Sequence, residues 1–338
     1  MKPKVSLLVA MRNEELHIEA CVNSILAQDY PPDRLEIFVL DGCSSDGSWK
    51  LVETLLQGRD NASLVKNTRM TQAAGWNVGI GLAAGDIIGI VSAHSELDRS
   101  YVSSAVATLQ RTGADMVGGP MRALGSGFVG DAVAVATSTR FGVGGARFHY
   151  AETERDVDTV YMGLCWRGVY DRLGGFDEEM VRDQDDELSY RLLSAGGRIV
   201  CDPAIRSTYH NRATLRSLWR QYLQYGFWKV RVMQKHPRQM RVRQFAPSAL
   251  VGAICISLLV IPFSRLGILT FLIIVGSYVS CSLGASLIAS RQGAWRLFRL
   301  LPIIYATLHF AYGTGFVLGL IRFWNKWNIG TTRYEGLT

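Results

Sequence analysis

The chain has 338 residues with 36 basic and 29 acidic side chains, giving a formal net charge of +7. Hydrophobic residues make up 48 % and charged residues 19 %, which excludes a disordered chain, because disorder needs low hydrophobicity and high net charge. Residues 1–202 hold 19 basic and 28 acidic side chains, whereas residues 203–338 hold 17 and one. Since the basic part is also the apolar part, we expect a membrane as its partner and no nucleic acid.

The first 120 residues alternate between short apolar runs and segments of helical spacing. The predicted strands are Val5–Ala10, Leu35–Asp41, Ser63–Lys66, Ile87–Val91 and Asp115–Val117. The predicted helices between them are Glu15–Ala27, Ser48–Leu56, Thr71–Ala84 and Arg99–Arg111. This alternation predicts an α/β fold with a mostly parallel sheet and helices on both faces. Ligands of such sheets bind at the carboxyl ends of the strands, where polar residues cluster in this chain.

The first apolar run also bears on cellular location. Val5–Met11 is only seven residues long and is followed directly by the polar residues 12–15. A secretory leader needs a longer apolar core, so this run is interpreted as a buried strand. The first 200 residues are therefore expected to remain in the cytoplasm.

The segment Asp41–Gly47 joins a predicted strand to a predicted helix. A helix cap at Asp46 or Ser48 and a turn at Gly42 account for its composition without any ligand. Alternatively, Asp41 accepts a hydrogen bond from a nucleobase N–H, with serine hydroxyls nearby. Taken alone, the segment favours the helix cap.

Ser92–Asp98 follows the fourth predicted strand. His94, Glu96 and Asp98 are its candidates for holding a divalent cation against a diphosphate, because hard cations prefer oxygen ligands and often keep phosphate. A single loop histidine is more often only hydrogen-bonded, so the segment alone does not establish a metal site.

Arg182–Leu188 is the densest acidic run of the chain and opens a predicted helix, Leu188–Ala195. Acidic residues suit a helix N-terminus because of the helix dipole, but four carboxylates in five positions exceed what capping requires. Like charges this close raise at least one pKa, which helps a carboxylate to act as a base. The run therefore favours a catalytic role, with Gly174–Asp177 as a turn that holds the loop.

Leu215–Lys235 has the spacing of an amphipathic helix with basic residues interspersed. Its composition suits a helix lying on anionic lipid. Gln221, Gln224, Tyr225 and Trp228 add the amides and aromatic faces that bind a sugar or a diphosphate, and both interpretations are compatible.

Three apolar runs follow, Phe245–Ser264, Leu266–Ala289 and Leu300–Ile321, each at least 20 residues long. A helix of that length is about 30 Å long and crosses a hydrocarbon core. The third run is the weakest, because Pro302, His309, Gly313 and Gly315 interrupt it. Nine Lys/Arg and no acid in residues 212–243 predict that the segment before the first span faces the cytoplasm.

The order of these motifs resembles that of a membrane-anchored inverting glycosyltransferase of family 2 with the GT-A fold, most closely the succinoglycan-biosynthesis glucosyltransferase group. The resemblance covers about residues 3–235. It rests on Val5–Glu15, Asp41–Gly47, Ala83–His94, Asp183–Leu188 and Gln221–Trp228.

The sequence departs from that family at three positions. Ser92-Ala93-His94 stands where the family has D-x-D, or D-x-H in this group, and a serine does not replace the charge of a carboxylate. Gln184 stands where the first acid of E-D-D-E-L is expected. Phe227 stands where Q-x-x-R-W has arginine, so processive synthesis is not expected.

The resemblance implies a role for each motif. The residues that would contact the nucleotide sugar are Arg12, Asn13, Glu14, Asp41, Ser44, Asp46 and Ser92. Asp185 and Asp186 would be the catalytic residues, with Asp185 as the general base, and His94 would bind a divalent cation, Mn²⁺ or Mg²⁺. The acceptor or diphosphate loop would contain Glu187, Gln221, Tyr225 and Trp228.

These expectations describe a multi-pass protein of the inner membrane that transfers a sugar from a nucleotide-diphosphate sugar, with UDP as the expected nucleotide. The acceptor would be a lipid-linked saccharide, and membrane lipids would be further partners. The expected regions are a catalytic domain, a basic interfacial helix region, a membrane region and a short tail, at residues 1–211, 212–243, 244–322 and 323–338.

Three alternatives remain open at this point. The acceptor could be a polyprenyl phosphate, which is already ionised and needs no base. The chain could also be an inactive nucleotide-sugar-binding scaffold, because Ser92 and Gln184 replace expected acids. A transporter is the least favoured, since no predicted span carries an Asp, Glu, Lys or Arg in its core.

Overall fold

The computed structural model describes residues 2–144 and 151–327 of the chain, which divides into two compact units. The first unit contains Met1–Leu124 and Ala146–His210, and the second contains Gly125–Gly145 and Asn211–Thr338. The predicted catalytic domain is continuous to residue 211, whereas in the structure the segment Gly125–Gly145 packs with the C-terminal unit. The predicted tail is described only as far as residue 327.

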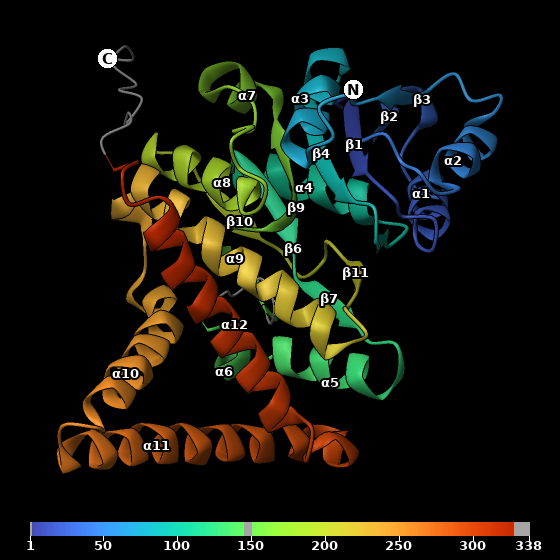
Figure 1. Ribbon diagram of the computed structural model, residues 1–338. Coiled ribbons are helices and arrows are strands. Elements are labelled where there is room, and N and C mark those ends of the chain that lie inside the picture. The colour runs from blue at the N-terminus through green and yellow to red at the C-terminus, as the bar shows by residue number, and fades with distance from the viewer. Residues whose placement is uncertain (1, 145–150, 328–338) are drawn as a thin grey trace. The chain divides into compact units, whose positions relative to one another are not determined.

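The first unit is built on an eight-stranded sheet with the strand order β3-β2-β1-β4-β9-β6-β10-β8 (Figure 1). Its strands are β1 (Val5–Met11), β2 (Leu35–Asp41), β3 (Ala62–Lys66), β4 (Ile87–Ser92), β6 (Met116–Gly119), β8 (Arg155–Asp156), β9 (Tyr161–Trp166) and β10 (Ile199–Cys201). Neighbouring strands among β1 to β4 pair in parallel, as the sequence predicted. However, β9 lies antiparallel between β4 and β6, and β8 pairs antiparallel with β10, so the sheet is mixed.

Helices cover both faces of this sheet, which confirms the predicted α/β arrangement. One face packs against α1 (Ile18–Leu26), α2 (Ser48–Leu56) and α4 (Tyr101–Thr112), and the other against α3 (Gln72–Leu82), α7 (Arg167–Leu173) and α8 (Gln184–Ser194). Val5, Leu7 and Val9 of β1 face the first cluster, and Leu8 faces the second. The strand is apolar along its whole length because both of its faces are buried.

A second, three-stranded sheet continues the first unit beyond the end of β4. Its strands are β5 (Ser95–Leu97), β7 (Met121–Leu124) and β11 (Ser207–His210), with β11 in the middle. The turn η1 (Pro32–Arg34) precedes β2. None of the three strands of this sheet was predicted, because runs of three or four residues carry no measurable periodicity.

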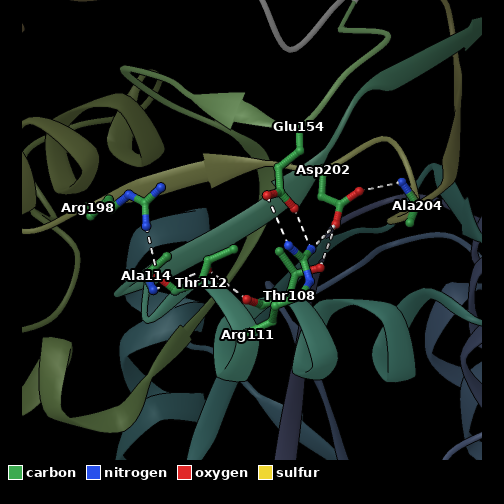
Figure 2. Close-up of polar contacts among 8 residues, drawn as sticks. All are labelled: Thr108, Arg111, Thr112, Ala114, Glu154, Arg198, Asp202 and Ala204. Atoms are coloured by element: carbon green, nitrogen blue, oxygen red, sulfur yellow. Dashed lines mark hydrogen bonds and ion pairs between the residues drawn. The ribbon is translucent and has the colours of Figure 1, made fainter.

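An ion-pair network ties α4 to the loops around β8 and β10 (Figure 2). Arg111 pairs with Glu154, and its Nη2 also lies 3.2 Å from Oδ2 of Asp202. The Thr108 hydroxyl donates to Asp202 at 2.7 Å, and the N–H of Ala204 donates at 2.8 Å. Burial by itself would raise the pKa of Asp202, but these hydrogen bonds and the charge of Arg111 outweigh it and lower the pKa.

We expect this network to make the stability of the first unit depend on acidity. The lowered pKa of Asp202 means that its stabilisation is complete above the unfolded-state value of about 3.9 and is lost as the pH falls through the folded-state value. The unfolding temperature should therefore fall less steeply for Asp202→Asn than for the wild type between about pH 5 and about pH 3. The exposed Asp60→Asn serves as the matched control and should follow the wild type. If the unfolding temperature falls with pH at the same slope in all three proteins, the contribution assigned to Asp202 would be contradicted.

The second unit is held together by close packing of α9 (Leu215–Lys235) on α12 (Leu301–Arg322). A Cβ added at Gly315 would lie 2.0 Å from the carbonyl oxygen of Leu223, and one at Gly226 would lie 1.9 Å from that of Tyr312. Glycine at these positions lets the two backbones approach, as small residues do between membrane helices. The predicted basic helix therefore forms with the expected bounds, and α12 covers one of its faces.

Three helices of the second unit are long and apolar enough to cross a membrane. They are α10 (Ala246–Val260, preceded by the turn η4, Val242–Phe245), α11 (Arg265–Ala289) and α12. The third predicted run is one continuous helix, because Pro302 stands in its first turn, where no N–H is needed. Few residues of α10 and α11 are buried, whereas nearly half of α12 is. The large apolar side chains of α11 that remain exposed include Leu266, Leu269, Leu272 and Ile273.

The segment that joins the C-terminal unit from the middle of the chain contains α5 (Gly127–Thr137) and α6 (Arg140–Val143). Ala132, Val133 and Ala136 pack in one apolar cluster with residues of α12. His309 of α12 bonds the carbonyl oxygen of Phe141 through Nε2 at 2.8 Å, and its Nδ1 lies 3.0 Å from the hydroxyl of Tyr278. Backbone inside an apolar region needs such partners, so this histidine has a structural use within the span.

Candidate active site

The residues predicted to contact the nucleotide sugar and the metal lie at the carboxyl edge of β1 to β4. The register pairs Met11 with Asp41, Asp41 with Lys66, and Ala10 with Ser92. The loops that leave these strands therefore start side by side. The parallel pairing that the sequence predicted is what brings residues 12–14, 41–46 and 92–94 together.

The loops after β1 and β2 are tied to one another through Asp41. Its carboxylate is almost fully buried and accepts hydrogen bonds from the N–H of Ser44 at 3.1 Å and from the Ser44 hydroxyl at 2.5 Å. The same hydroxyl accepts from the N–H of Asn13 at 2.9 Å, and Oδ1 of Asn13 accepts from the N–H of Ser45 at 2.8 Å. These contacts hold the polar loops after β1 and β2 in fixed positions at this edge.

Asp46 lies beside the start of α2, but the N-cap of that helix is Gly47, which makes no side-chain capping hydrogen bond, so the predicted cap at Asp46 or Ser48 is wrong. The Oδ1 of Asp46 accepts from the N–H and the hydroxyl of Ser48 at the start of α2, and its Oδ2 accepts from the N–H of Glu15. Slight desolvation raises the pKa of Asp46, but these hydrogen bonds outweigh it and lower the pKa. Arg12 is exposed, and a Cβ added at Gly42 would lie 3.4 Å from its own.

Ser92 and His94 lie at the end of β4, where the cation was expected. The Nδ1 of His94 lies 3.3 Å from Oε1 of Glu14, and both side chains are about one-fifth exposed, at 21 % and 23 %. No group of three His, Cys, Asp or Glu side chains suitable for a metal occurs in the described part of the chain. Glu14 and His94 nevertheless provide one oxygen and one nitrogen donor. That set fits a cation that takes its other ligands from a diphosphate and water.

The two other metal candidates of this segment have different partners. Glu96 pairs with His210, whose Nε2 lies 2.6 Å from the Glu96 Oε1. Asp98 accepts hydrogen bonds from the N–H and the hydroxyl of Ser100 just before α4, and these bonds lower its pKa. Both carboxylates therefore have local structural uses.

The acidic run forms the first turn of α8. Gln184, Asp185, Asp186 and Glu187 all lie inside this helix, which starts four residues earlier than predicted. The Oδ1 of Asp185 accepts from the N–H of Asp186 at 3.0 Å, and the side chain is half-buried. Gln184 is buried, and its Nε2 lies 3.3 Å from Oε1 of Gln72, the first residue of α3.

Gln72 connects the acidic turn to the loops at the carboxyl edge of β1 to β3. It follows the loop after β3, in which the N–H of Asn67 donates to the carbonyl oxygen of Asp41 at 2.7 Å and Asn67 Nδ2 donates to that of Thr71 at 2.7 Å. A short path of contacts therefore runs from Asp41 through Asn67 and Gln72 to the turn that carries Asp185. Gln184, which replaces an expected acid, is part of this path.

Glu187 lies in a different environment from the acceptor loop that was expected. It is buried and forms an ion pair with Arg191, whose Nη2 lies 2.8 Å from the Glu187 Oε2. The same guanidinium donates to the carbonyl oxygens of Leu173 and Gly175 at 2.7 and 2.8 Å. Through Arg191, Glu187 therefore holds the Gly174–Asp177 turn against α8. The sequence predicted that this turn holds the acidic loop, but it did not predict this role for Glu187.

The turn is fixed from its other side by α3. Asn77 Oδ1 accepts from the N–H of Phe176, and Asn77 Nδ2 donates to the Phe176 carbonyl and to Glu178. The Phe176 ring packs against Trp76 at 4.7 Å between ring centroids and against Tyr170 at 5.9 Å. The Gly174–Asp177 turn is thus anchored to α3 and α7, two helices of the same sheet face.

The three predicted residues of α9 belong to the second unit. Gln221 Nε2 donates to the hydroxyl of Tyr225, one turn later, at 2.9 Å. The Trp228 ring lies against Phe323 at 5.6 Å and against Phe227 at 5.7 Å. Their assignment to the acceptor or the diphosphate stays a prediction.

Backbone strain marks the same edge of the first unit. Five described non-glycine residues have a positive φ, and they lie in the loops after β1, β2 and β3, at the start of β9 and before α8. Such conformations cost of the order of 1–3 kcal/mol each and tend to cluster at functional sites. They are Asn13, Cys43, Met70, Met162 and Asp183.

Several residues of this edge were not predicted. One sequence signal could have indicated Asn67, Gln72 and Asn77. Each is a polar residue just after a strand or on the first turns of the following helix. Tyr161 and Tyr209 stack edge to face at 5.8 Å, and Tyr209 also contacts His94 at 5.2 Å. These two tyrosines come from β9 and β11, strands that no local pattern indicated.

The mixed sheet, covered by helices on both faces and carrying polar loops at the carboxyl edge of β1 to β4, is the architecture of a GT-A glycosyltransferase fold. Residues 6–156, just under half of the chain, match the family Glycosyl transferase family 2. The protein is therefore a transferase enzyme that acts on a nucleotide sugar in glycan synthesis, which confirms the class that the motifs predicted.

Two curated relatives cover most of the chain. A dolichyl N-acetyl-alpha-D-glucosaminyl phosphate 3-beta-D-2,3-diacetamido-2,3-dideoxy-beta-D-glucuronosyltransferase of Methanococcus voltae is 26 % identical over 94 % of this chain and 97 % of its own length. The succinoglycan biosynthesis protein ExoA of Rhizobium meliloti is 28 % identical over 72 % of this chain and 74 % of its own. The second relative agrees with the predicted group.

Solved structures support the fold. The mannosyltransferase PcManGT from Pyrobaculum calidifontis, in complex with GDP-Man and Mn²⁺, is 21 % identical and has a TM-score of 0.60, over 96 % of this chain and 88 % of that one. S. aureus TarS residues 1–349 are 17 % identical with a TM-score of 0.54, over 94 % and 91 %. At these identities the likeness concerns the GT-A fold, which is confirmed.

Proposed function

We propose that this enzyme transfers a sugar, with inversion, from a nucleoside-diphosphate sugar to a lipid-linked saccharide at the cytoplasmic face of the inner membrane. The observation that supports it most is the path of contacts from Asp41 to the first turn of α8. It joins a preformed polar edge suited to a nucleoside with the half-buried carboxylate of Asp185. A donor bound at that edge would present its sugar toward a carboxylate.

In the proposed reaction Asp185 takes the proton of the acceptor hydroxyl while the oxygen of that hydroxyl attacks the anomeric carbon. The new C–O bond forms as the bond from the anomeric carbon to the diphosphate breaks on the opposite face, which inverts the configuration. Glu187 and Arg191 act as positioning residues in this proposal, because their ion pair ties the Gly174–Asp177 turn to α8.

A divalent cation fits this site through His94 and Glu14. When bound, it would supply positive charge to the departing diphosphate. UDP is the nucleotide we expect, and Asn13, Asp41 and Ser44 are its expected partners.

The acceptor is inferred from the second unit. Three apolar helices and a strongly basic segment before them support a membrane location with that segment on the cytoplasmic side. The Methanococcus voltae relative is by name a transferase onto a dolichyl-linked sugar phosphate. We extend that acceptor class to this chain.

The test is a transfer assay with the purified full-length chain in lipid nanodiscs. The donors are a panel of UDP- and GDP-sugars, and the acceptors are a polyprenyl-diphosphate saccharide and a bare polyprenyl phosphate, each with Mn²⁺, Mg²⁺ or EDTA. We expect release of the nucleoside diphosphate with one donor and only with the saccharide acceptor. Transfer to the bare phosphate, or no turnover with any donor, would contradict the proposal.

A further inference from the structure

Ser92 leaves this enzyme with one fewer negative charge at the end of β4 than a D-x-H segment would provide. A cation bound there by His94 and diphosphate alone would have no anionic protein ligand. The acidic side chain beside the His94 imidazole is Glu14, whose Oε1 lies 3.3 Å from the histidine Nδ1. Glu14 comes from the loop after the neighbouring strand β1 and was expected to contact the nucleotide.

Both residues are held in place mainly by hydrogen bonds of their backbone groups to neighbouring segments. The N–H of Glu14 donates to the hydroxyl of Ser48 at 2.9 Å, and its carbonyl oxygen accepts from the N–H groups of His17 and Ile18 as α1 begins. The carbonyl oxygen of His94 accepts from the N–H of His210 at 3.2 Å, and its ring packs edge-on against Tyr209. The register of Ala10 with Ser92 places the two loops beside each other.

The spacing of the two donor atoms suits a shared ion. Two ligands at right angles on a cation with bonds of about 2.1 Å stand about 3 Å apart. The Glu14–His94 separation of 3.3 Å is close to that value. One carboxylate oxygen and one imidazole nitrogen suit Mn²⁺.

We propose that Glu14 and His94 together form the cation site, and that Glu14 supplies the negative charge that Ser92 lacks. The inference rests on the proposed function only in taking the remaining ligands from the diphosphate of a nucleotide. In this inference Glu14 is a ligand of the metal and not a contact of the nucleobase or the ribose. The competing outcome is that Glu14 and His94 form an ion pair and bind no metal.

The test measures Mn²⁺ binding directly, by the loss of the free Mn²⁺ signal in electron paramagnetic resonance, for the full-length protein in nanodiscs with UDP or GDP present. We expect Glu14→Gln to weaken Mn²⁺ binding about tenfold or more, because a charged ligand is lost. His94→Gln should weaken it similarly. Adding Ser92→Asp to Glu14→Gln should recover most of the affinity, since it returns a carboxylate to the end of β4.

Glu19→Gln is the matched control, because Glu19 is exposed on α1 a few residues further along, and it should bind Mn²⁺ like the wild type. Nucleotide affinity in EDTA should be the same for the wild type and Glu14→Gln, which also shows that the variant is folded. Unchanged Mn²⁺ affinity in Glu14→Gln would overturn the inference. An equal loss of nucleotide affinity with and without Mn²⁺ would also overturn it, because Glu14 would then contact the nucleotide. Mn²⁺ binding as expected in a protein that transfers no sugar would refute the proposed function and leave this inference standing.

Discussion

Replacing Asp185 by asparagine should lower turnover by about 10²–10⁴ while donor binding is kept. Asp185 is half-buried in the first turn of α8, where its Oδ1 accepts the N–H of Asp186. Asparagine keeps the size and the hydrogen bond but cannot take the proton of an acceptor hydroxyl. The change should therefore appear in kcat and leave the KM for the donor nearly unaltered.

Asp186→Asn is the matched control for this result, because it alters the adjacent carboxylate of the same helical turn. If Asp185 is the general base, Asp186→Asn should lose less turnover than Asp185→Asn. Near-wild-type turnover in Asp185→Asn would refute the assignment. A mild effect together with transfer to polyprenyl phosphate would identify the acceptor as an ionised phosphate, which needs no base.

Replacing Arg191 by methionine should destabilise the first unit strongly. Its guanidinium is only 7 % exposed, and it pairs with a Glu187 carboxylate that is 4 % exposed. Methionine fills a similar volume but leaves that carboxylate buried and uncompensated, together with the carbonyl oxygens of Leu173 and Gly175. Breaking a buried pair in this way costs about 3–5 kcal/mol, so the unfolding temperature should fall by of the order of 10 °C.

The measurement is thermal unfolding of the detergent-solubilised full-length chain, followed by tryptophan fluorescence. Arg172→Met is the control, because the Arg172–Asp115 pair is 39 % and 31 % exposed and should contribute at most about 1 kcal/mol. The double variant Glu187→Met/Arg191→Met should be more stable than Arg191→Met, since it leaves no charge buried. If Arg191→Met unfolds at the same temperature as the wild type, the Glu187–Arg191 pair is not needed to hold the Gly174–Asp177 turn.

The agreement between sequence and structure is closest where a local pattern is long. The bounds of α2 and α9 match the predicted helices, and β2 matches its predicted strand residue for residue. Each is defined by apolar periodicity within one segment. The membrane helices were also predictable, because about 20 apolar residues in succession seldom occur outside membrane spans.

The acidic run illustrates how far local reasoning extends. Its helix was predicted to begin at Leu188, whereas α8 begins at Gln184 and includes the acidic residues. Acids at a helix start and acids in a loop have the same composition, so sequence alone does not separate them. The i, i+4 spacing of Glu187 and Arg191 in α8 permits their ion pair, but its burial depends on how α7 and α8 pack.

The sequence by itself determined the α/β class, the three apolar helices and the candidate residues after each parallel strand, because these follow from periodicity and turn chemistry within short windows. The tertiary structure decided the insertion of β9 between β4 and β6, the transfer of Gly125–Gly145 to the second unit and the meeting of Glu14 with His94. Each of these joins residues far apart in the chain. Such contacts are selected by the free energy of burying and pairing whole surfaces. A pattern within one short segment contains no information on that free energy.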